Sequence, residues 1–430
     1  MITVGLDFGT HQTKVCIENK DGVELSYSFM KFKDAYHREC YTLPSIIGIG
    51  KDDLLSYGYL NRWYDGRVIK YFKQSTFRSS TNMSQINAMY YSTWYLAYIL
   101  FDLESLYGQE FTIQMGAPTD SSHVNTAKQI ATRIIASAYR LVEDVFDNDK
   151  EKFLATTMKE LVELTTIVPY SDKVKEDYGL LVFPEAYACL KPLVSQKKLS
   201  AGMNLMIDIG GGTTDISFFT IESKDPKNPN CNEFIPQVYD FTSVNKGLNF
   251  LTRSDDKTQG GVESNVKDVS EIDMRRRDVY IRDISWACNS LREKLKREFK
   301  NQTSLDQRRL LDALKNRPLV YCGGGSTFKT LRVSYEGYKD KKLISHQEWD
   351  VKSIKDIEDI IELKLCPILS TAYGLAISTE NDNIVMKPLK DIFENIRGAE
   401  EEHRHVAIRN STFGSAYGGF SYGDDWDAWK

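Results

Sequence analysis

The chain carries one short pattern twice, and this repeat constrains its fold more than any other feature. The first copy is "GLDFGTHQTKVCI" (5–17) and the second is "MIDIGGGTTDISF" (206–218). When the copies are overlaid, the matching positions are Asp7 on Asp208, Gly9 on Gly210, Thr13 on Thr214, Val15 on Ile216 and Ile17 on Phe218. Each copy is an apolar run, an aspartate, a glycine-bearing turn and a second apolar run, which predicts a β-hairpin.

Two further pairs of segments follow in the same order. "FTIQMGAP" (111–118) and "PLVYCGGG" (318–325) each predict a strand that runs into a glycine turn before a helix. "FPEAYACL" (183–190) and "CPILSTAYGLA" (366–376) each predict a helix that begins just after a proline. Three pairs in one order indicate that the chain consists of two similar halves.

Strands alternate with helices along the chain, which is typical of the α/β class. Strands are predicted at 2–8, 13–18, 111–116, 204–209, 214–221 and 318–322, and helices at 84–107, 122–146, 184–196, 270–300, 304–315 and 368–378. The predicted domains are lobe I (1–198), lobe II (199–385, with a smaller subdomain at 246–315) and a C-terminal segment (386–430). A polar stretch at 252–268 predicts an exposed loop, and the C-terminal segment ends in a flexible aromatic and acidic tail.

Composition excludes several classes of function. A net charge of −5 over 430 residues gives no electrostatic footprint for nucleic acid or for an anionic membrane, so neither is expected as a partner. Seven cysteines without ligand-like spacing indicate reduced thiols and a cytoplasmic location. Asp7 interrupts the first apolar run, so no signal peptide is expected. The apolar stretch at 86–101 is too short and too polar at its edges to cross a bilayer.

The second turn, "DIGGGTTD", has the chemistry of a phosphate site. Gly210, Gly211 and Gly212 let backbone N–H groups approach an anion without interference from a Cβ atom. Thr213 and Thr214 can add hydroxyl donors. A single turn of this kind could equally be a plain glycine turn, but the repeated turn makes that interpretation weaker.

Carboxylates flank these glycines and would repel a phosphate unless a cation lies between them. Asp208 and Asp215 stand on either side of the turn, and Asp7 adds a third carboxylate if the two hairpins face each other. Mg²⁺ is commonly held by carboxylates together with substrate phosphates, and it keeps several of its waters. We therefore predict a Mg²⁺ site at these three residues, mostly through water.

A third glycine cluster, "CGGGSTF" (322–328), lies between a predicted strand and a predicted helix. Its backbone could lie against a base or a ribose, and Ser326 could cap the following helix. A tight connection without a ligand is the alternative. The chain has no GxxxxGK[ST] motif and no GxGxxG after its first strand, which argues against the P-loop and Rossmann arrangements.

The order of "GLDFGT", "PEAYA", "IDIGGGTTDIS" and "VYCGGGSTF" resembles the actin, sugar-kinase and heat-shock-chaperone ATPase superfamily over residues 1 to 380. The resemblance implies two similar actin-like (ribonuclease-H-like) lobes that flank a cleft for ATP or ADP with Mg²⁺, each with a smaller subdomain. It implies phosphate binding by the two turns, at Gly9, Thr10, His11, Gln12, Gly210, Gly211, Gly212, Thr213 and Thr214. It implies adenosine binding at Gly323, Gly324, Gly325 and Ser326.

Within the superfamily, the chain most resembles the nucleotide-binding domain of DnaK-like heat-shock chaperones. "VIKYFKQSTFR" (68–78) resembles the segment with their catalytic lysine, which assigns that role to Lys73, with Lys70 as the rival. "ISWACNSLREKLKREF" (284–299) resembles their adenine-lining helix and implies contacts from Arg292, Asn289 and Lys296. A helix so rich in charge could equally be a solvated face with pairs four residues apart.

The chain departs from the family pattern at three places. His11 and Gln12 replace the small or hydroxyl-bearing residues that usually follow the first Gly-Thr. The usual Glu-Pro order is reversed as Pro184-Glu185, which resembles the plasmid-segregating actins and leaves Glu185 to orient the attacking water. No segment after residue 390 resembles the substrate-binding β-sandwich of a chaperone.

The function implied is Mg²⁺-dependent ATP hydrolysis that drives a conformational switch and controls a protein partner. The implied catalytic residues are Asp7, Lys73, Glu185, Asp208 and Asp215. The alternative is an actin-like filament ATPase, in which the partner is a second copy of the chain. A small-molecule kinase has less support, because no motif supplies its substrate pocket.

Overall fold

The computed structural model describes residues 2–22, 24–61, 63–77, 83–118, 124–195, 204–223, 234–251, 272–298, 319–331, 344–345 and 353–379. The first half contains a mixed sheet with the strand order β11–β10–β1–β2–β3. Its strands are β1 (Ile2–Asp7), β2 (Gln12–Asp21), β3 (Glu24–Phe29), β10 (Phe111–Ala117) and β11 (Leu180–Pro184), and β6 (Leu43–Pro44) pairs with β2.

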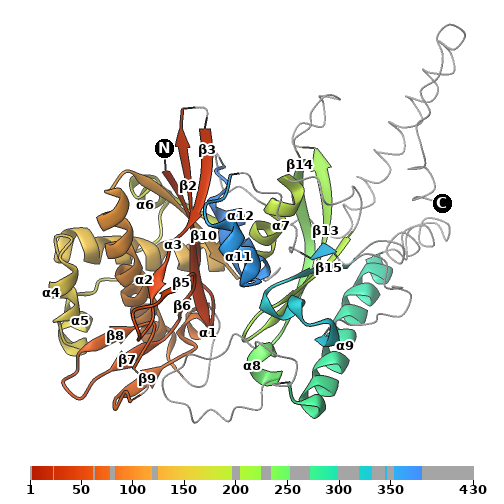
Figure 1. Cartoon of the computed structure of the whole chain (residues 1–430), viewed down its shortest axis with the longest axis horizontal. Coiled ribbons are helices and arrows are strands. Elements are labelled where there is room, and N and C mark those ends of the chain that lie inside the picture. The colour runs from red at the N-terminus through yellow and green to blue at the C-terminus, as the bar shows by residue number, and fades with distance from the viewer. Residues whose placement is uncertain are drawn as a thin grey trace, which may run out of the picture.

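The second half repeats this arrangement of strands. Its sheet has the order β16–β15–β12–β13–β14, formed by β12 (Asn204–Ile209), β13 (Thr214–Ser223), β14 (Phe234–Val244), β15 (Leu319–Cys322) and β16 (Ile344–Ser345). In both sheets three consecutive strands pair antiparallel, and two later strands add parallel to the first of them. Figure 1 shows the two sheets side by side. The predicted α/β class and both predicted hairpins are therefore confirmed.

The register of the two hairpins confirms the overlay of the two sequence copies. Asp7 pairs across its hairpin with Lys14, and Asp208 pairs in the same way with Asp215. Because side chains alternate along a strand, this common register also places each matched apolar residue on the same face of its sheet.

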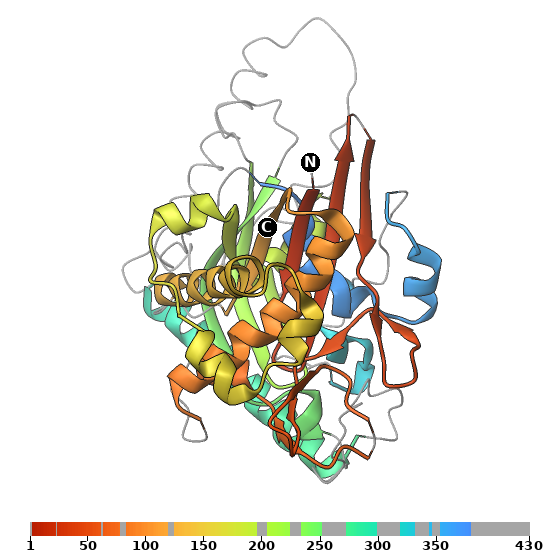
Figure 2. The same ribbon diagram turned by 90° about the vertical axis from the view of Figure 1, so that its left-hand side faces the viewer.

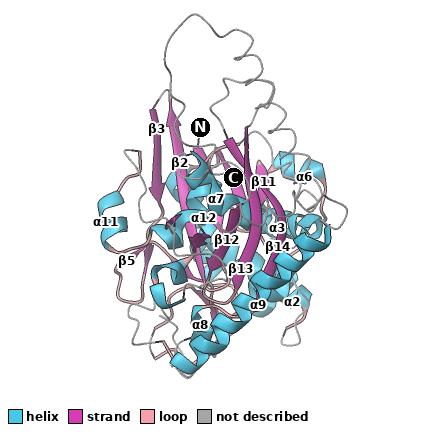
Figure 3. Cartoon of the chain, turned by 90° about the vertical axis from the view of Figure 1, so that its right-hand side faces the viewer, coloured by secondary structure: helices cyan, strands magenta, loops and turns pink. Residues whose placement is uncertain are grey.

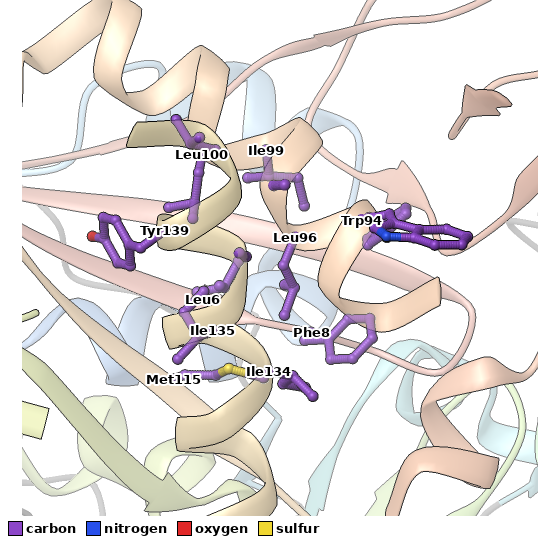
Figure 4. Packing of buried hydrophobic residues seen from close by; sticks show 14 of the residues in the cluster. Leu6, Phe8, Trp94, Leu96, Ile99, Leu100, Met115, Ile134, Ile135 and Tyr139 are labelled. Atoms are coloured by element: carbon purple, nitrogen blue, oxygen red, sulfur yellow. The ribbon is translucent and has the colours of Figure 1, made fainter. Parts of the chain in front are cut away.

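Two long helices cover the outer face of the first sheet (Figure 2). They are α2 (Gln85–Tyr107) and α3 (Val124–Arg140), and α3 continues into a π-helical turn (Leu141–Val145). Ser84 caps α2 by accepting a hydrogen bond from the backbone N–H of Asn87. Strand and helix side chains interdigitate in one core, including Leu6, Met115, Leu96 and Ile135 (Figure 4).

Burial of α2 explains why its sequence is so apolar and aromatic. Trp94 and Tyr95 lie fully inside the core, and the Trp94 indole donates a hydrogen bond to Thr165. Among the described helices, none combines the length and the apolar character needed to cross a bilayer.

Smaller elements complete the first half. β4 (Phe32–Lys33) pairs with β5 (Glu39–Cys40), and β7 (Ile47–Ile49) pairs with both β8 (Leu55–Tyr57) and β9 (Arg67–Ile69). The chain then forms α1 (Phe72–Phe77), and α4 (Lys150–Leu154), α5 (Met158–Leu164) and α6 (Asp172–Asp177) follow α3. α1 carries Lys73, one of the predicted catalytic residues.

On the second sheet, α9 (Met274–Glu298) lies across the outer face (Figure 3). Tyr280, Ile284 and Leu291 of this helix share a core with Ile207 and Phe218 of the sheet. The short helix α8 (Leu248–Leu251) packs against α9 beside the second hairpin turn.

Two helices connect the halves by crossing from one to the other. α7 (Glu185–Ser195) follows β11 of the first sheet but packs on the second, where Cys189 and Leu193 meet Met206. α12 (Cys366–Ala376) packs on the first sheet instead, with Tyr373 stacked edge-on against Tyr27. α7 and α12 lie between the sheets in Figure 1 and touch where Gly374 meets the backbone of Ala188.

Some local predictions were wrong or incomplete. The strands β3 to β9, β11, β14 and β16 were not predicted. Pro367 lies inside the first turn of α12 rather than before it. Ser326 does not cap a helix, because it lies inside the 3-10 turn Gly324–Thr327, whose N-cap position is Gly323. The predicted loop 252–268, helix 304–315 and segment 386–430 lie outside the described residues.

Candidate functional site

The first hairpin turn is fixed by a serine from a neighbouring strand connection. The Ser45 hydroxyl donates a 2.7 Å hydrogen bond to the carbonyl of Gly9, and the Ser45 N–H donates one of 2.8 Å to the carbonyl of His11. The Thr13 hydroxyl lies 3.2 Å from that of Ser45. Ser45 therefore holds the turn that carries Thr10, His11 and Gln12, all of them half-buried. The sequence analysis did not identify Ser45.

Asp7, at the end of β1, forms an ion pair. It is 6 % exposed, and Lys14 donates a 2.8 Å hydrogen bond from Nζ to its Oδ2. The ion pair follows from the register, because the two residues face each other across the hairpin. The sequence analysis missed Lys14, although the overlay places it on Asp215.

The second hairpin turn is supported by the segment that leads into α8. The N–H groups of Leu248 and Asn249 donate to the carbonyls of Gly210 and Gly211 at 3.0 and 2.9 Å. The N–H groups of Gly211 and Gly212 donate to no other residue in the described part of the chain. The carbonyls of this turn are therefore bound, while two adjacent amide donors remain for a ligand.

Support for this turn continues in β13. Thr214 is fully buried, and its hydroxyl donates a 2.8 Å hydrogen bond to the carbonyl of Lys246 and lies 2.8 Å from the Tyr280 hydroxyl of α9. Thr214 was predicted to bind phosphate, but its hydroxyl serves to hold the turn. Thr213, one residue earlier, is half-buried.

Asp208 lies in a cluster of negative charge. Burial raises the pKa of Asp208 to about 7, and the carboxylates of Asp215, Asp7 and Glu185 raise it too, while Lys14 acts in the opposite direction. The backbone of Gly323 approaches so closely that a Cβ atom at this position would overlap Asp208. The predicted adenosine turn therefore lies directly beside the second hairpin.

The two turns face each other through His11. Its ring projects from the first turn onto the second, so that a Cβ atom built on Gly211 would lie 2.7 Å from His11 Cδ2. Asn249, which follows the second turn, places its Nδ2 atom 2.9 Å from His11 Nδ1. The structure therefore brings together the two predicted phosphate turns.

Lys73 and Glu185 also meet, although α1 and α7 are far apart in sequence. The Lys73 ammonium pairs with Glu185 Oε1 and lies 5.7 Å from the centre of the Phe8 ring. Lys73 is 5 % exposed, whereas Lys70 is half-buried and precedes α1. Gly116 leaves room for Glu185, since a Cβ atom there would lie 2.9 Å from its Cγ. The structure thus brings Lys73, rather than Lys70, to a predicted catalytic carboxylate.

The remaining predicted adenosine residues are less closely grouped. Gly324, Gly325 and Ser326 form a 3-10 turn directly after β15. On α9, Arg292 is half-buried and Asn289 is exposed, while the side chain of Lys296 lies outside the description.

No group of three or more histidine, cysteine, aspartate or glutamate side chains forms a direct metal site among the residues described. Asp7, Asp208 and Asp215 nevertheless suit a hydrated cation, because they crowd negative charge onto the half-buried Asp208. Hydrated Mg²⁺ suits such a donor set, since it binds through few carboxylates and retains water.

No protein-family model matches the chain, and no curated protein matches it significantly in sequence. A function for the chain is therefore inferred from the residues of the two turns and their surroundings.

Proposed function

We propose that the chain is an ATP-binding and ATP-hydrolysing protein, dependent on Mg²⁺, whose halves are actin-like lobes on either side of a nucleotide. The observation that supports it most is the pair of facing turns at equivalent places in two sheets of identical strand order. One turn offers the N–H groups of Gly211 and Gly212 beside crowded carboxylates. Amides for phosphate and carboxylates for a cation are what a nucleotide with its metal ion requires.

Each residue near the turns has a role in this proposal. The amides of the second turn and the hydroxyl of Thr10 bind phosphate oxygens. Asp208 and Asp215 hold a hydrated Mg²⁺ ion, which supplies the positive charge that lets carboxylates and phosphates share one site. The turn at Gly323 to Gly325, whose backbone packs closely against Asp208 and Ile209, contacts the adenosine.

Lys73 and Glu185 supply the groups that phosphoryl transfer needs near the attacking water. The Glu185 carboxylate orients and accepts a proton from water, and the Lys73 ammonium stabilises negative charge that develops on the terminal phosphate. Their ion pair holds both side chains in place before the nucleotide binds. Lys14 adds a second positive charge close to the first turn.

The connection between the halves suits a switch. A nucleotide that contacts both turns would favour one relative position of the two sheets, and release of the terminal phosphate would remove that preference. α7 and α12 would carry the change, because each belongs to one half and packs on the other. The consequence is control of a protein partner that binds one of the two states.

Phosphate release in the presence of ATP and Mg²⁺ tests this proposal. We expect Asp208→Asn to lower the rate about 100-fold, the size of effect that follows loss of one charge-stabilising group. The control is Asp278→Asn, which removes an exposed carboxylate from α9 in the same half and leaves the rate unchanged. Failure of the unaltered chain to bind ATP with Mg²⁺ would refute the proposal.

Sedimentation and light scattering distinguish the proposed conformational switch from the alternative, an actin-like filament ATPase. The order Pro184-Glu185 at the start of α7 is the observation that favours an actin-like filament. Growth of a sedimenting polymer upon addition of ATP and Mg²⁺ would replace the switch by the filament, with ATP hydrolysis retained.

A further inference from the structure

Each hairpin has a buried threonine beside a tyrosine of the helix that covers its sheet. The threonines are Thr13 and Thr214, which match in the two sequence copies, and the tyrosines are Tyr95 of α2 and Tyr280 of α9. All four side chains are fully buried. The two helices hold equivalent places, because each lies in the chain between the third and the fourth of the five strands common to both sheets. Neither tyrosine was identified from the sequence.

In the second half, Tyr280 holds Thr214, and Thr214 holds the segment that supports the turn. The Thr214 hydroxyl donates its one proton to the carbonyl of Lys246 at 2.8 Å. The Tyr280 hydroxyl, also 2.8 Å away, is therefore the donor to the Thr214 oxygen. The segment that begins at Lys246 then binds the carbonyls of the second turn through its N–H groups, as described above. A chain of hydrogen bonds thus runs from α9 to the turn.

In the first half, Tyr95 acts through Ser45 as well as Thr13. Its hydroxyl donates to the carbonyls of Leu43 and Pro44, at 3.1 and 3.0 Å, and thereby fixes the residues just before Ser45. Burial raises the pKa of Tyr95, and hydrogen bonds with the hydroxyls of Thr13 and Ser45 act against this rise. Ser45 in turn binds the carbonyls of the first turn, as described above. A chain of hydrogen bonds thus runs from α2 to this turn too.

Binding of the carbonyls sets the direction of the amides. In a trans peptide unit the C=O and N–H groups point in opposite directions. The bound carbonyls of Gly210 and Gly211 belong to the same peptide units as the N–H groups of Gly211 and Gly212. In the first turn, the bound carbonyls share their peptide units with the N–H groups of Thr10 and Gln12. In both turns the predicted phosphate-binding amides are therefore aimed away from the supporting segment.

We propose that Tyr95 and Tyr280 are positioning residues for phosphate binding, one for each turn. This inference rests on the proposed function and deepens it. Each tyrosine hydroxyl holds the segment that binds the carbonyls of its turn, and so sets the direction of the amides that meet the phosphates. Neither hydroxyl touches the nucleotide. A misplacement of about 1 Å can lower the rate of a reaction about 100-fold, so a turn without this support loses rate before it loses affinity.

Tyr280→Phe and Tyr95→Phe test the proposal, because each removes one hydroxyl and keeps the buried ring. Phosphate release over a range of ATP concentrations with Mg²⁺ gives kcat and KM for each variant. We expect kcat to fall about tenfold and KM for ATP to change by less than about twofold, because the amides still bind phosphate but place it less precisely. The matched control is Tyr57→Phe, which removes a buried hydroxyl without a hydrogen-bond partner among the described residues and leaves both constants unchanged.

Thr214 provides a second test of the same chain of hydrogen bonds. Thr214→Val keeps the shape of the side chain but cannot bind Tyr280 or the carbonyl of Lys246, so it is expected to lower kcat as Tyr280→Phe does. Thr214→Ser retains the hydroxyl and is expected to recover most of the rate. The double variant of Tyr280→Phe with Thr214→Val is expected to be no slower than the slower single variant, since both changes break one chain.

The outcomes separate this inference from the proposed function. An unchanged kcat in both tyrosine variants, with the unaltered chain active, would overturn the positioning role and leave ATP hydrolysis standing. An equal loss in Tyr57→Phe would also overturn it, because the effect would then follow from the loss of any buried hydroxyl. Absence of ATP hydrolysis by the unaltered chain would instead refute the proposed function.

Discussion

The two hairpins have the same register but carry different charges at the same place. In the first, Asp7 faces Lys14 and the two form an ion pair. In the second, Asp208 faces Asp215, and like charges directly opposite each other on two strands are unfavourable. The first hairpin therefore carries an ion pair at the place where the second sets two carboxyl groups opposite each other.

The two turns differ in the size of their side chains, and the larger side chains of the first lie where the second has none. In the overlay, Thr10 and His11 of the first turn stand where the second has Gly211 and Gly212. The side chain of His11 lies against the bare backbone of those glycines. The two copies of the repeat therefore contribute different groups: the first contributes the His11 side chain, and the second contributes glycine backbone and two facing carboxyl groups.

The two halves also differ in packing two residues before each aspartate, where β1 has Gly5 and β12 has Met206. A Cβ atom at Gly5 would overlap the backbone of Ala372 and Ala376, because α12 lies directly on β1. We expect Gly5→Ala to lower the free energy of unfolding by about 3 kcal/mol, since the backbone of a helix cannot give way without loss of packing. Denaturant titration followed by circular dichroism measures this.

Met206→Leu is the matched change in the second half. Met206 is fully buried and packs with Leu190 and Leu193 of α7, so a substitution that conserves volume is expected to cost less than about 1.5 kcal/mol. Equal effects of the two variants would contradict the view that the halves pack their crossing helices differently.

The features that could be predicted from the sequence are those that depend on the local alternation of apolar and polar residues. An apolar run, an aspartate and a glycine turn suffice to specify each hairpin, and the period of two in a strand then specifies its register. The edge strand β14 was missed because Pro236 interrupts its pattern, and proline is tolerated only where a strand has an open edge. β11 was missed because "LLVFP" is a short apolar run next to a predicted helix.

The site was predicted as a set of residue types rather than as a set of contacts. The role of Lys14 becomes clear only from its ion pair with Asp7, which it faces across the hairpin. Asn249 reaches His11 from 238 residues away, and no local pattern reveals such a contact. Ser326 was assigned as a cap because it follows glycines, but the turn closes as a 3-10 helix around it.

Exchange of charge tests whether the hairpins have distinct tasks. Asp215→Lys gives the second hairpin the pairing of the first and places an ammonium group opposite Asp208. We expect it to lower Mg²⁺-dependent ATP hydrolysis about 100-fold, because the carboxylates no longer attract a cation. Phosphate release over a range of Mg²⁺ concentrations measures this, with Asp278→Lys on α9 as the control for charge. A rate that remains normal would show that Asp215 has no part in cation binding.

A further prediction concerns the dependence of stability on pH in the absence of divalent cations. Because the pKa of Asp208 is raised to about 7 in the folded chain, the fold retains a proton that the unfolded chain loses near pH 4. The contribution of this proton to stability is present at low pH and is lost as the pH rises from about 4 to about 7. We expect the loss to be about 2 kcal/mol, since the half-buried carboxyl is partly solvated.

Asp208→Asn separates this contribution from those of other titrating groups. The amide cannot ionise, so the free energy of unfolding of the variant, measured with a chelator present, is expected to fall less between pH 4 and pH 7 than that of the unaltered chain. If the proposed Mg²⁺ site is correct, Mg²⁺ added at pH 7 is expected to stabilise the unaltered chain more than the variant, because a cation would then replace the proton beside Asp208. Identical pH profiles for the two chains would mean that the charge of Asp208 does not destabilise the second hairpin. The two hairpins would then differ in the side chains of their turns but not in electrostatic stability.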